Sequence, residues 1–203
     1  MQTLSEIREL LAAAGVRPRK RMGQCFLIDG NLIRKLLELA ELSGGETVLE
    51  VGAGTGSLTE ELLSRAARVV AVELDSALAG VVRQRLGDSE GLTILNCDVL
   101  AGKHALSPAV VAELPAGEVH LVANLPYGCA VPVVVNCLLR SWLAVRAGES
   151  SFARLTFTIQ RELAERLTAP VGGDHYGPVA VISALLARAT LGRTVPALSL
   201  IHI

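Results

Sequence analysis

The feature that most constrains the fold of this chain is an apolar run that ends in three alternating glycines. The run is Val48-Leu-Glu-Val51, and Gly52, Gly54 and Gly56 follow it. A second apolar run ends in Glu73. Glycine lets the backbone approach a ligand closely, and a carboxylate at a strand end can accept hydrogen bonds from a ribose diol. Together they predict a nucleotide-type cofactor site at the carboxyl ends of two neighbouring parallel strands.

Around this loop, short β-branched runs alternate with amphipathic helices. Nearly continuous apolar strands separated by such helices indicate a parallel sheet that is covered on both faces. We therefore expect an α/β, Rossmann-like fold with a mostly parallel twisted sheet and helices on both faces. The expected strands are 47–51, 69–74, 92–96, 119–123, 153–159 and 189–195. The expected helices run from Thr3 to Gly15 and from Asp29 to about Leu42, and then over 57–66, 76–86, about 105–113, 131–145, 160–168 and 176–187.

The spacing of the glycines favours one cofactor over others. Nicotinamide and flavin enzymes carry similar loops, but a dinucleotide fingerprint places its third glycine three residues after the second to meet a pyrophosphate. Here the glycines alternate strictly, and an acid, Glu50, precedes them within the strand. S-adenosylmethionine (SAM) has no phosphate, so the pattern predicts SAM on Gly52 and Gly54, with its ribose on Glu73. Asp98, after the third strand, can accept from the adenine amine, and helix capping is the alternative.

A second motif, Asn124-Leu-Pro-Tyr127, follows the fourth strand, where ligands bind in open α/β sheets. Adenine N6 is a poor nucleophile because its lone pair is delocalised into the ring. Acceptors on the Asn124 side chain and the Leu125 main chain can hold both amine hydrogens and favour a pyramidal nitrogen. Pro126 fixes the turn, and Tyr127 can stack on the base. All four are therefore predicted to be catalytic, although Asn124 alone is also typical of a turn before a helix.

Taken in order, these residues resemble the KsgA-type ribosomal RNA adenine dimethyltransferases, with the erythromycin-resistance methyltransferases as close cousins. The resemblance covers about Arg19 to Thr194 and is carried by Lys20-Arg-Met-Gly-Gln-Cys-Phe-Leu27, Glu50-Val-Gly-Ala-Gly-Thr-Gly56, Val72-Glu-Leu-Asp75, Cys97-Asp98, Asn124-Leu-Pro-Tyr127, Gln160-Arg-Glu-Leu-Ala-Glu-Arg166 and Tyr176-Gly177. It implies dimethylation of N6 of two adjacent adenosines near the 3′ end of small-subunit rRNA during ribosome assembly. It also implies SAM contacts at Cys25, Leu27, Gly52, Glu73, Asp98 and Asn124.

Several positions depart from the pattern of the family. Cys25 stands where the family usually has Asn, and a thiol cannot copy both functions of an amide. Gly128-Cys-Ala-Val-Pro132 replaces a more polar stretch, and Tyr176-Gly-Pro178 replaces a frequent Tyr-Gly-Arg. We also expect the helical carboxyl-terminal domain of the family to be missing, which should weaken RNA binding because phosphate contacts dominate RNA affinity.

A local basic cluster is the candidate RNA contact. The formal net charge of −1 gives no global attraction to nucleic acid, but four cations fall within five positions: Arg17, Arg19, Lys20 and Arg21. A solvated flexible arm is the alternative. The four cysteines lack metal-ligand spacing and the four histidines do not cluster with them, so no metal is expected. The sequence shows neither a signal peptide nor a membrane span, which predicts a soluble, cytoplasmic protein.

We expect three segments: 1–30 as an N-terminal helix with a basic, cofactor-contacting loop, 31–195 as a class I SAM-dependent methyltransferase domain lacking its seventh strand, and 196–203 as a short, non-native tail. The predicted partners are ribosomal RNA and the immature small ribosomal subunit, bound by a monomer without membrane or metal. Two alternatives stay open: methylation of large-subunit 23S rRNA, as in macrolide resistance, and a non-enzymatic role in binding RNA or assembling ribosomes. A nicotinamide-dependent oxidoreductase is a third, disfavoured by the glycine spacing.

Overall fold

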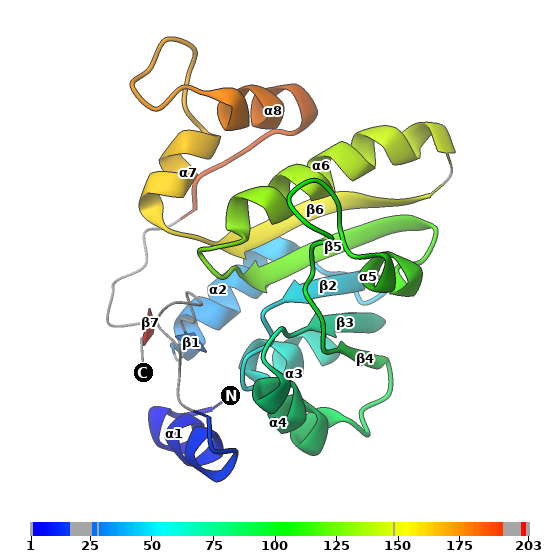
Figure 1. Cartoon of the computed structure of the whole chain (residues 1–203), viewed down its shortest axis with the longest axis vertical. Helices are drawn as coiled ribbons and strands as arrows, with labels where there is room; N and C mark the ends of the chain where they lie inside the picture. The colour runs from blue at the N-terminus through cyan, green and yellow to red at the C-terminus, as the bar shows by residue number, and fades with distance from the viewer. Residues whose placement is uncertain (1, 17–25, 28, 148, 193–199, 202–203) are drawn as a thin grey trace.

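A computed structural model describes residues 2–16, 26–27, 29–147, 149–192 and 200–201, and shows an α/β domain (Figure 1). Its strands are β1 (Phe26–Leu27), β2 (Thr47–Val51), β3 (Arg68–Val72), β4 (Leu92–Leu95), β5 (Gly117–Asn124), β6 (Ser150–Thr158) and β7 (Leu200–Ile201). Its helices are α1 (Leu4–Ala13), α2 (Gly30–Ala40), α3 (Ser57–Leu63), α4 (Ser76–Leu86), α5 (Pro108–Glu113), α6 (Ala130–Ala147), α7 (Arg161–Leu167) and α8 (Pro178–Leu186).

The main sheet has five strands in the order β4-β3-β2-β5-β6, and each neighbouring pair is parallel. The chain steps outward from β2 to β4 and then crosses back to place β5 on the other side of β2. The boundary between β2 and β5 is therefore the point at which the strand order reverses. Ligands of open α/β sheets bind at this point, outside the carboxyl ends of the strands. The glycine loop and the Asn124 motif both lie there.

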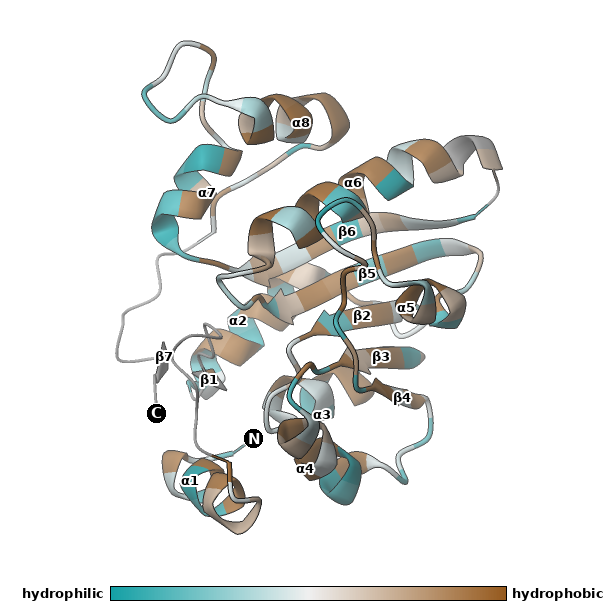
Figure 2. Cartoon of the chain, in the orientation of Figure 1, coloured by the Kyte–Doolittle hydropathy of each residue, from teal (hydrophilic) through white to brown (hydrophobic). Residues whose placement is uncertain are grey.

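Helices cover both faces of the sheet, as expected. On one face Val48, Val69 and Ala71 pack with Ile33 of α2 and Leu62 of α3. The opposite face carries another core cluster, in which α5 and α6 contribute residues against β2, β3 and β5. Figure 2 shows the consequence: β2, β3 and β5 are mostly brown, while the helices mix apolar and polar segments. Strands buried on both faces explain why the sequence reads there as continuous apolar runs.

Helix starts follow the capping signals in the sequence. Thr3 and Glu6 form the predicted capping box at α1, and Asp29 and Asp75 cap α2 and α4 by accepting from backbone N–H groups. α1 then buries Ile7 against Leu78 of α4. The N-terminal helix therefore packs against α4, the helix that follows β3.

One region near the end of the chain differs from expectation. The predicted strand 189–195 is wrong for its described part, because 189–192 is non-strand and exposed. The apolar residues in this described part, Ala189 and Leu191, belong to no strand, and hydrophobicity alone does not make one. Within the predicted tail, Leu200–Ile201 pairs antiparallel with Phe26–Leu27. In the described parts of the chain, no helix is long and apolar enough to cross a bilayer.

Candidate cofactor and target site

Residues from both motifs meet at one cavity of about 260 Å³ at the carboxyl ends of the strands. The predicted residues that line it are Leu27, Gly52, Gly54, Glu73, Asp98, Asn124 and Pro126. Leu125 and Tyr127 are not among the lining residues, and Leu125 is only 2% exposed. Cys25, Arg17, Arg19, Lys20 and Arg21 lie outside the described residues.

The glycine loop needs its glycines for backbone conformation. Gly52, Gly54 and Gly56 have φ values of 79°, 60° and 82°, in the left-handed region that side chains disfavour. The N–H of Gly52 donates to the Val72 carbonyl at 2.8 Å, which ties the loop to β3. A Cβ on Gly52 would lie 3.1 Å from Cγ of Pro126. The loop after β2 therefore packs closely against the turn after β5.

Glu73 is held by main-chain donors from both sides. Its Oε2 accepts from the Gly54 N–H at 2.8 Å, and its Oε1 accepts from the Asp75 N–H at 2.9 Å. Burial raises the pKa of this carboxyl group, against the effect of those hydrogen bonds. The Asn96 side chain donates to the Glu73 carbonyl at 2.8 Å and fixes the strand end. Each carboxylate oxygen has a further lone pair, so a diol can bind without displacing the backbone.

A second carboxyl group, Glu50, lies beneath the glycine loop. It is 1% exposed, and the Thr59 hydroxyl donates to its Oε2 at 2.6 Å. Burial raises the pKa of Glu50 to about 8, an effect to which the nearby Glu73 charge adds. Glu50 is therefore mostly protonated at neutral pH, although it lines the same cavity as the carboxyl groups of Glu73 and Asp98.

Asp98 lines the cavity at its exposed rim. Its Oδ1 accepts from the Leu100 N–H at 2.9 Å, which closes a local turn. The helix-capping alternative is wrong, because the next helix, α5, has Ser107 at its N-cap position. The second oxygen of Asp98 is the group available for a ligand.

The Asn124 motif is fixed by the neighbouring strand. The Leu125 N–H donates to the Thr158 carbonyl at 3.1 Å, and the Thr158 hydroxyl donates to Oδ1 of Asn124. The Pro126 carbonyl accepts from the N–H groups of Cys129 and Ala130, both at 3.1 Å, at the start of α6. Strand and helix thereby hold the turn from both ends, which places Asn124 at the cavity wall.

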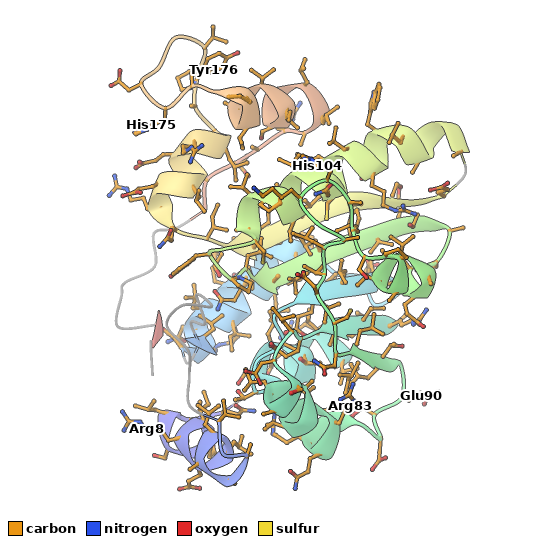
Figure 3. All side chains as sticks on the ribbon, viewed as in Figure 1. Arg8, Arg83, Glu90, His104, His175 and Tyr176 are labelled. Atoms are coloured by element: carbon orange, nitrogen blue, oxygen red, sulfur yellow. The ribbon has the colours of Figure 1, made fainter. Side chains whose placement is uncertain are left out.

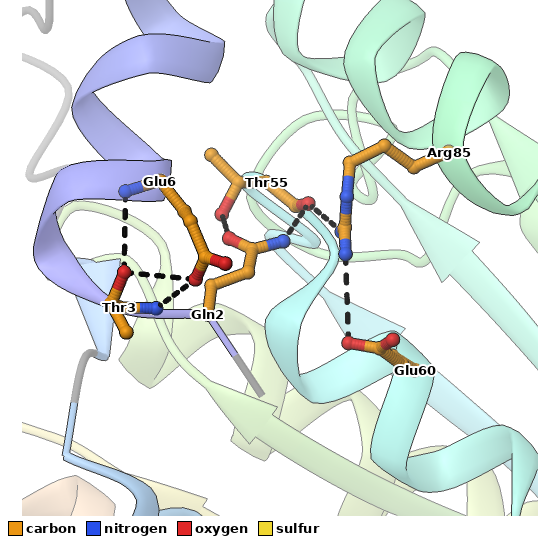
Figure 4. Close-up of polar contacts among 6 residues, drawn as sticks. All are labelled: Gln2, Thr3, Glu6, Thr55, Glu60 and Arg85. Carbon is orange, nitrogen blue, oxygen red and sulfur yellow. Dashed lines mark hydrogen bonds and ion pairs between the residues drawn. The ribbon is translucent and has the colours of Figure 1, made fainter.

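Gln2, near the N-terminus, is hydrogen-bonded to Thr55 of the glycine loop (Figure 4). The Gln2 side chain donates to the Thr55 carbonyl at 2.9 Å and accepts from the Thr55 hydroxyl at 2.6 Å. The Arg85 guanidinium also donates to the Thr55 carbonyl, at 2.6 Å, and pairs with Glu60 at 3.5 Å. This network restrains the loop through Thr55, which itself lines the cavity.

Sequence reasoning missed Thr158, Gln2 and Thr55. Thr158 ends the strand beside β5, so its place at the same sheet edge was the available signal. Nothing local in the sequence connects Gln2 with Thr55, 53 positions away. His104 and His175 lie outside the site: Figure 3 shows His104 in the loop before α5 and His175 between α7 and α8. Within the described ranges, no group of three or more His, Cys, Asp or Glu side chains is placed to hold a metal ion.

Comparison with known sequences identifies the family to which this arrangement belongs. The family described as "Ribosomal RNA adenine dimethylase" matches residues 15–199. The chain belongs to the ribosomal RNA adenine dimethylase family. Among its relatives, the "Ribosomal RNA small subunit methyltransferase A" of Phenylobacterium zucineum is 39% identical over 97% of this chain and 64% of the relative. The protein of the same name from an Arthrobacter species is 42% identical over 89% of this chain and 57% of the relative. The chain thus spans roughly three fifths of the length of these relatives.

Two solved structures share the fold of this chain. The 23S rRNA methyltransferase ErmE matches with a TM-score of 0.58 and 31% identity, over 72% of this chain and 52% of ErmE. A dimethyladenosine transferase from Plasmodium falciparum matches with a TM-score of 0.58 over 77% of this chain and 51% of that one. Its 24% identity supports the fold alone. The α/β, Rossmann-like methyltransferase fold expected from the sequence is confirmed.

Proposed function

We propose that this chain binds SAM and transfers its methyl group to N6 of adenosine in ribosomal RNA. The observation that carries the proposal is the single cavity lined by Gly52, Gly54, Glu73, Asp98 and Asn124. SAM supplies, when bound, a methyl group activated on a sulfonium. Glu73 accepts from the ribose hydroxyls, Asp98 from the adenine amine, and the glycine loop holds the methionine end.

A buried polar atom supports this choice of ligand. The Ser57 hydroxyl, next to the third glycine, lines the cavity, is buried and has no hydrogen-bond partner among the described residues. Leaving such a group unpaired costs about 1–3 kcal/mol, so a polar ligand is expected beside it. The methionine end of SAM carries an ammonium and a carboxylate, and either can pair with a hydroxyl. The cavity volume is close to the lower end of the range for small-molecule sites, about 300–1,000 Å³.

At the other wall, Asn124 is the group that handles the target. Its Oδ1, together with the Leu125 carbonyl, holds the two hydrogens of the target amine and directs the nitrogen lone pair toward the methyl group. The proton of the methylated nitrogen passes to water. These residues act by orientation and electrostatics, with no covalent enzyme intermediate. We infer that Tyr127 stacks on the target base, which enters flipped or already single-stranded.

The proposed substrate is small-subunit rRNA in an immature subunit, with two adjacent adenosines near its 3′ end dimethylated. The names of the relatives from Phenylobacterium and Arthrobacter support the small subunit. The basic residues Arg17, Arg19, Lys20 and Arg21 are the proposed RNA contacts, and Cys25 and Leu27 the proposed N-terminal contacts of SAM. We further propose a cytoplasmic monomer that needs no metal.

Two assays test this proposal. Calorimetry should give micromolar binding of SAM and none of NAD, and absent or millimolar SAM binding would remove the enzymatic function in favour of an RNA-binding role. Tritiated methyl transfer is then compared on under-methylated 30S particles and on 23S rRNA. Transfer to 30S particles is expected. Transfer to 23S rRNA alone would favour the activity named for ErmE.

A further inference from the structure

Thr158 contacts the Asn124 motif at two points, although it lies outside that motif in sequence. Its carbonyl accepts from the Leu125 N–H at 3.1 Å, and its hydroxyl donates to Oδ1 of Asn124. Thr158 is the last residue of β6, Asn124 is the last residue of β5, and the two pair in register. In-register residues on adjacent parallel strands present their side chains to the same face of the sheet. Thr158 therefore lies beside Asn124, which lines the cavity, although Thr158 is not itself a lining residue.

A β-bulge in β6 creates this pairing. Val119 pairs with Phe152, but the next residue, His120, pairs with Arg154, so that Ala153 is skipped. If Ala153 were instead paired with His120 in regular register, Asn124 would lie opposite Phe157 and not Thr158. A one-residue shift reverses which side chains face a given side, and bulges often redirect side chains beside active sites. The register thus brings a hydroxyl, in place of an aromatic ring, next to the Asn124 amide.

We propose that Thr158 is a positioning residue that fixes the orientation of the Asn124 side chain for methyl transfer. This inference rests on the proposed function of Asn124. The χ2 torsion of asparagine has a broad distribution. An amide group that nothing holds can therefore rotate and place its nitrogen where the reaction needs its oxygen. The threonine hydroxyl is held by a stiff, β-branched χ1. By donating to Oδ1, the hydroxyl keeps this oxygen in place for the amine of the target base.

The test compares Thr158→Val, which keeps the shape and removes the hydroxyl, with Thr158→Ser, which keeps the hydroxyl. Thr156→Val is the matched control, because Thr156 lies on the same strand two positions earlier, opposite the aliphatic Val122. The readouts are kcat on under-methylated 30S particles, the Kd of SAM by calorimetry, Tm, and the ¹⁵N–¹H signals of the Asn124 side-chain amide, identified by their loss in Asn124→Ser.

Thr158→Val is expected to lower kcat about tenfold, which is the effect of one lost hydrogen bond at a reacting group. The Kd of SAM and Tm should stay near wild type, the Asn124 amide signals should shift, and Thr158→Ser should retain kcat within about threefold. A Thr158→Val variant with wild-type kcat and unshifted amide signals would overturn the inference. So would an equal effect of Thr156→Val.

The amide signals separate this inference from the proposed function. If the wild-type chain binds SAM but methylates no RNA, the proposed function fails. The Asn124 amide signals then still show whether Thr158 positions the Asn124 side chain. A shift of these signals in Thr158→Val supports this positioning, and unchanged signals reject it.

Discussion

The two halves of the cavity are built by different means. In the cofactor half, after β2 and β3, main-chain N–H groups hold a buried carboxylate, and left-handed glycines shape the loop. In the target half, after β5, the side chain of Asn124 is oriented by the hydroxyl of Thr158. Main-chain contacts depend on the fold, whereas a side-chain contact can be removed alone. Substitutions should therefore separate binding of the cofactor from transfer of its methyl group.

The largest expected effect comes from Asn124→Ala. Removing a preorganised group at the reacting atoms typically lowers the rate about 10²–10³-fold, and we expect a loss of methyl transfer of at least this size. SAM binding should change by no more than about threefold, because the ribose and adenine contacts remain. Tritiated methyl transfer and calorimetry measure the two quantities, with the exposed Asn31→Ala as the control. An equal loss of both would mean that Asn124 serves only the cofactor.

Glu73→Gln should have the opposite effect: it should weaken SAM binding and leave the rate of methyl transfer nearly unchanged. It replaces an acceptor that can bind two ribose hydroxyls, and hydrogen bonds to charged groups contribute about 1.5–3 kcal/mol, so the Kd of SAM should rise about 10–100-fold. At saturating SAM the rate of transfer should stay close to wild type. Exposed Glu118→Gln provides the control for loss of charge. A normal Kd together with a large fall in rate would contradict the assignment of Glu73 to the cofactor half.

Gly52→Ala should impair both halves together. A Cβ at this position would lie 3.1 Å from Cγ of Pro126, and the φ of 79° is unfavourable for alanine. We expect the free energy of unfolding to fall by about 1–2 kcal/mol. SAM affinity and transfer rate should each fall about tenfold, because the loop and the Asn124 turn are displaced together. Gly45→Ala is the matched control, since nothing lies within 4 Å of its Cβ position. Unchanged stability and binding in Gly52→Ala would show that the two turns are not packed as described.

The last expected effect concerns Glu50 and the pH dependence of stability. Its pKa is about 8 in the folded protein against an ordinary value of 4.5, so between these values the folded state keeps a proton that the unfolded state loses. Stability is therefore full below pH 4.5 and declines as pH rises toward 8, by at most about 1.4 kcal/mol per unit. Glu50→Gln should flatten this decline in urea titrations at pH 5, 6, 7 and 8. An identical decline of stability with pH in wild type and variant would refute the assignment of this effect to Glu50.

The sequence was sufficient for the features that depend on local chemistry. The capping residues Thr3, Asp29 and Asp75, and the apolar run into Gly52, carry their own signals of conformation. Because strand ends of a parallel sheet meet at one edge, these signals also predicted that the two motifs share a cavity.

The remaining features depend on pairing between distant segments. The bulge at Ala153 decides which residue of β6 faces Asn124, and no local pattern predicts it. The same holds for Gln2 and Thr55, and for the strand expected at 189–195, whose apolar residues find no partner strand in the described part. The assignment of Cys25 and of the basic cluster stays a prediction.

The most direct test of the central claim is a crystal structure of the chain with SAM. We predict that the ribose hydroxyls lie within hydrogen-bond distance of the Glu73 carboxylate, and that the sulfonium methyl faces the side chain of Asn124. A SAM molecule bound in another cavity, or one whose methyl group points away from Asn124, would contradict the account.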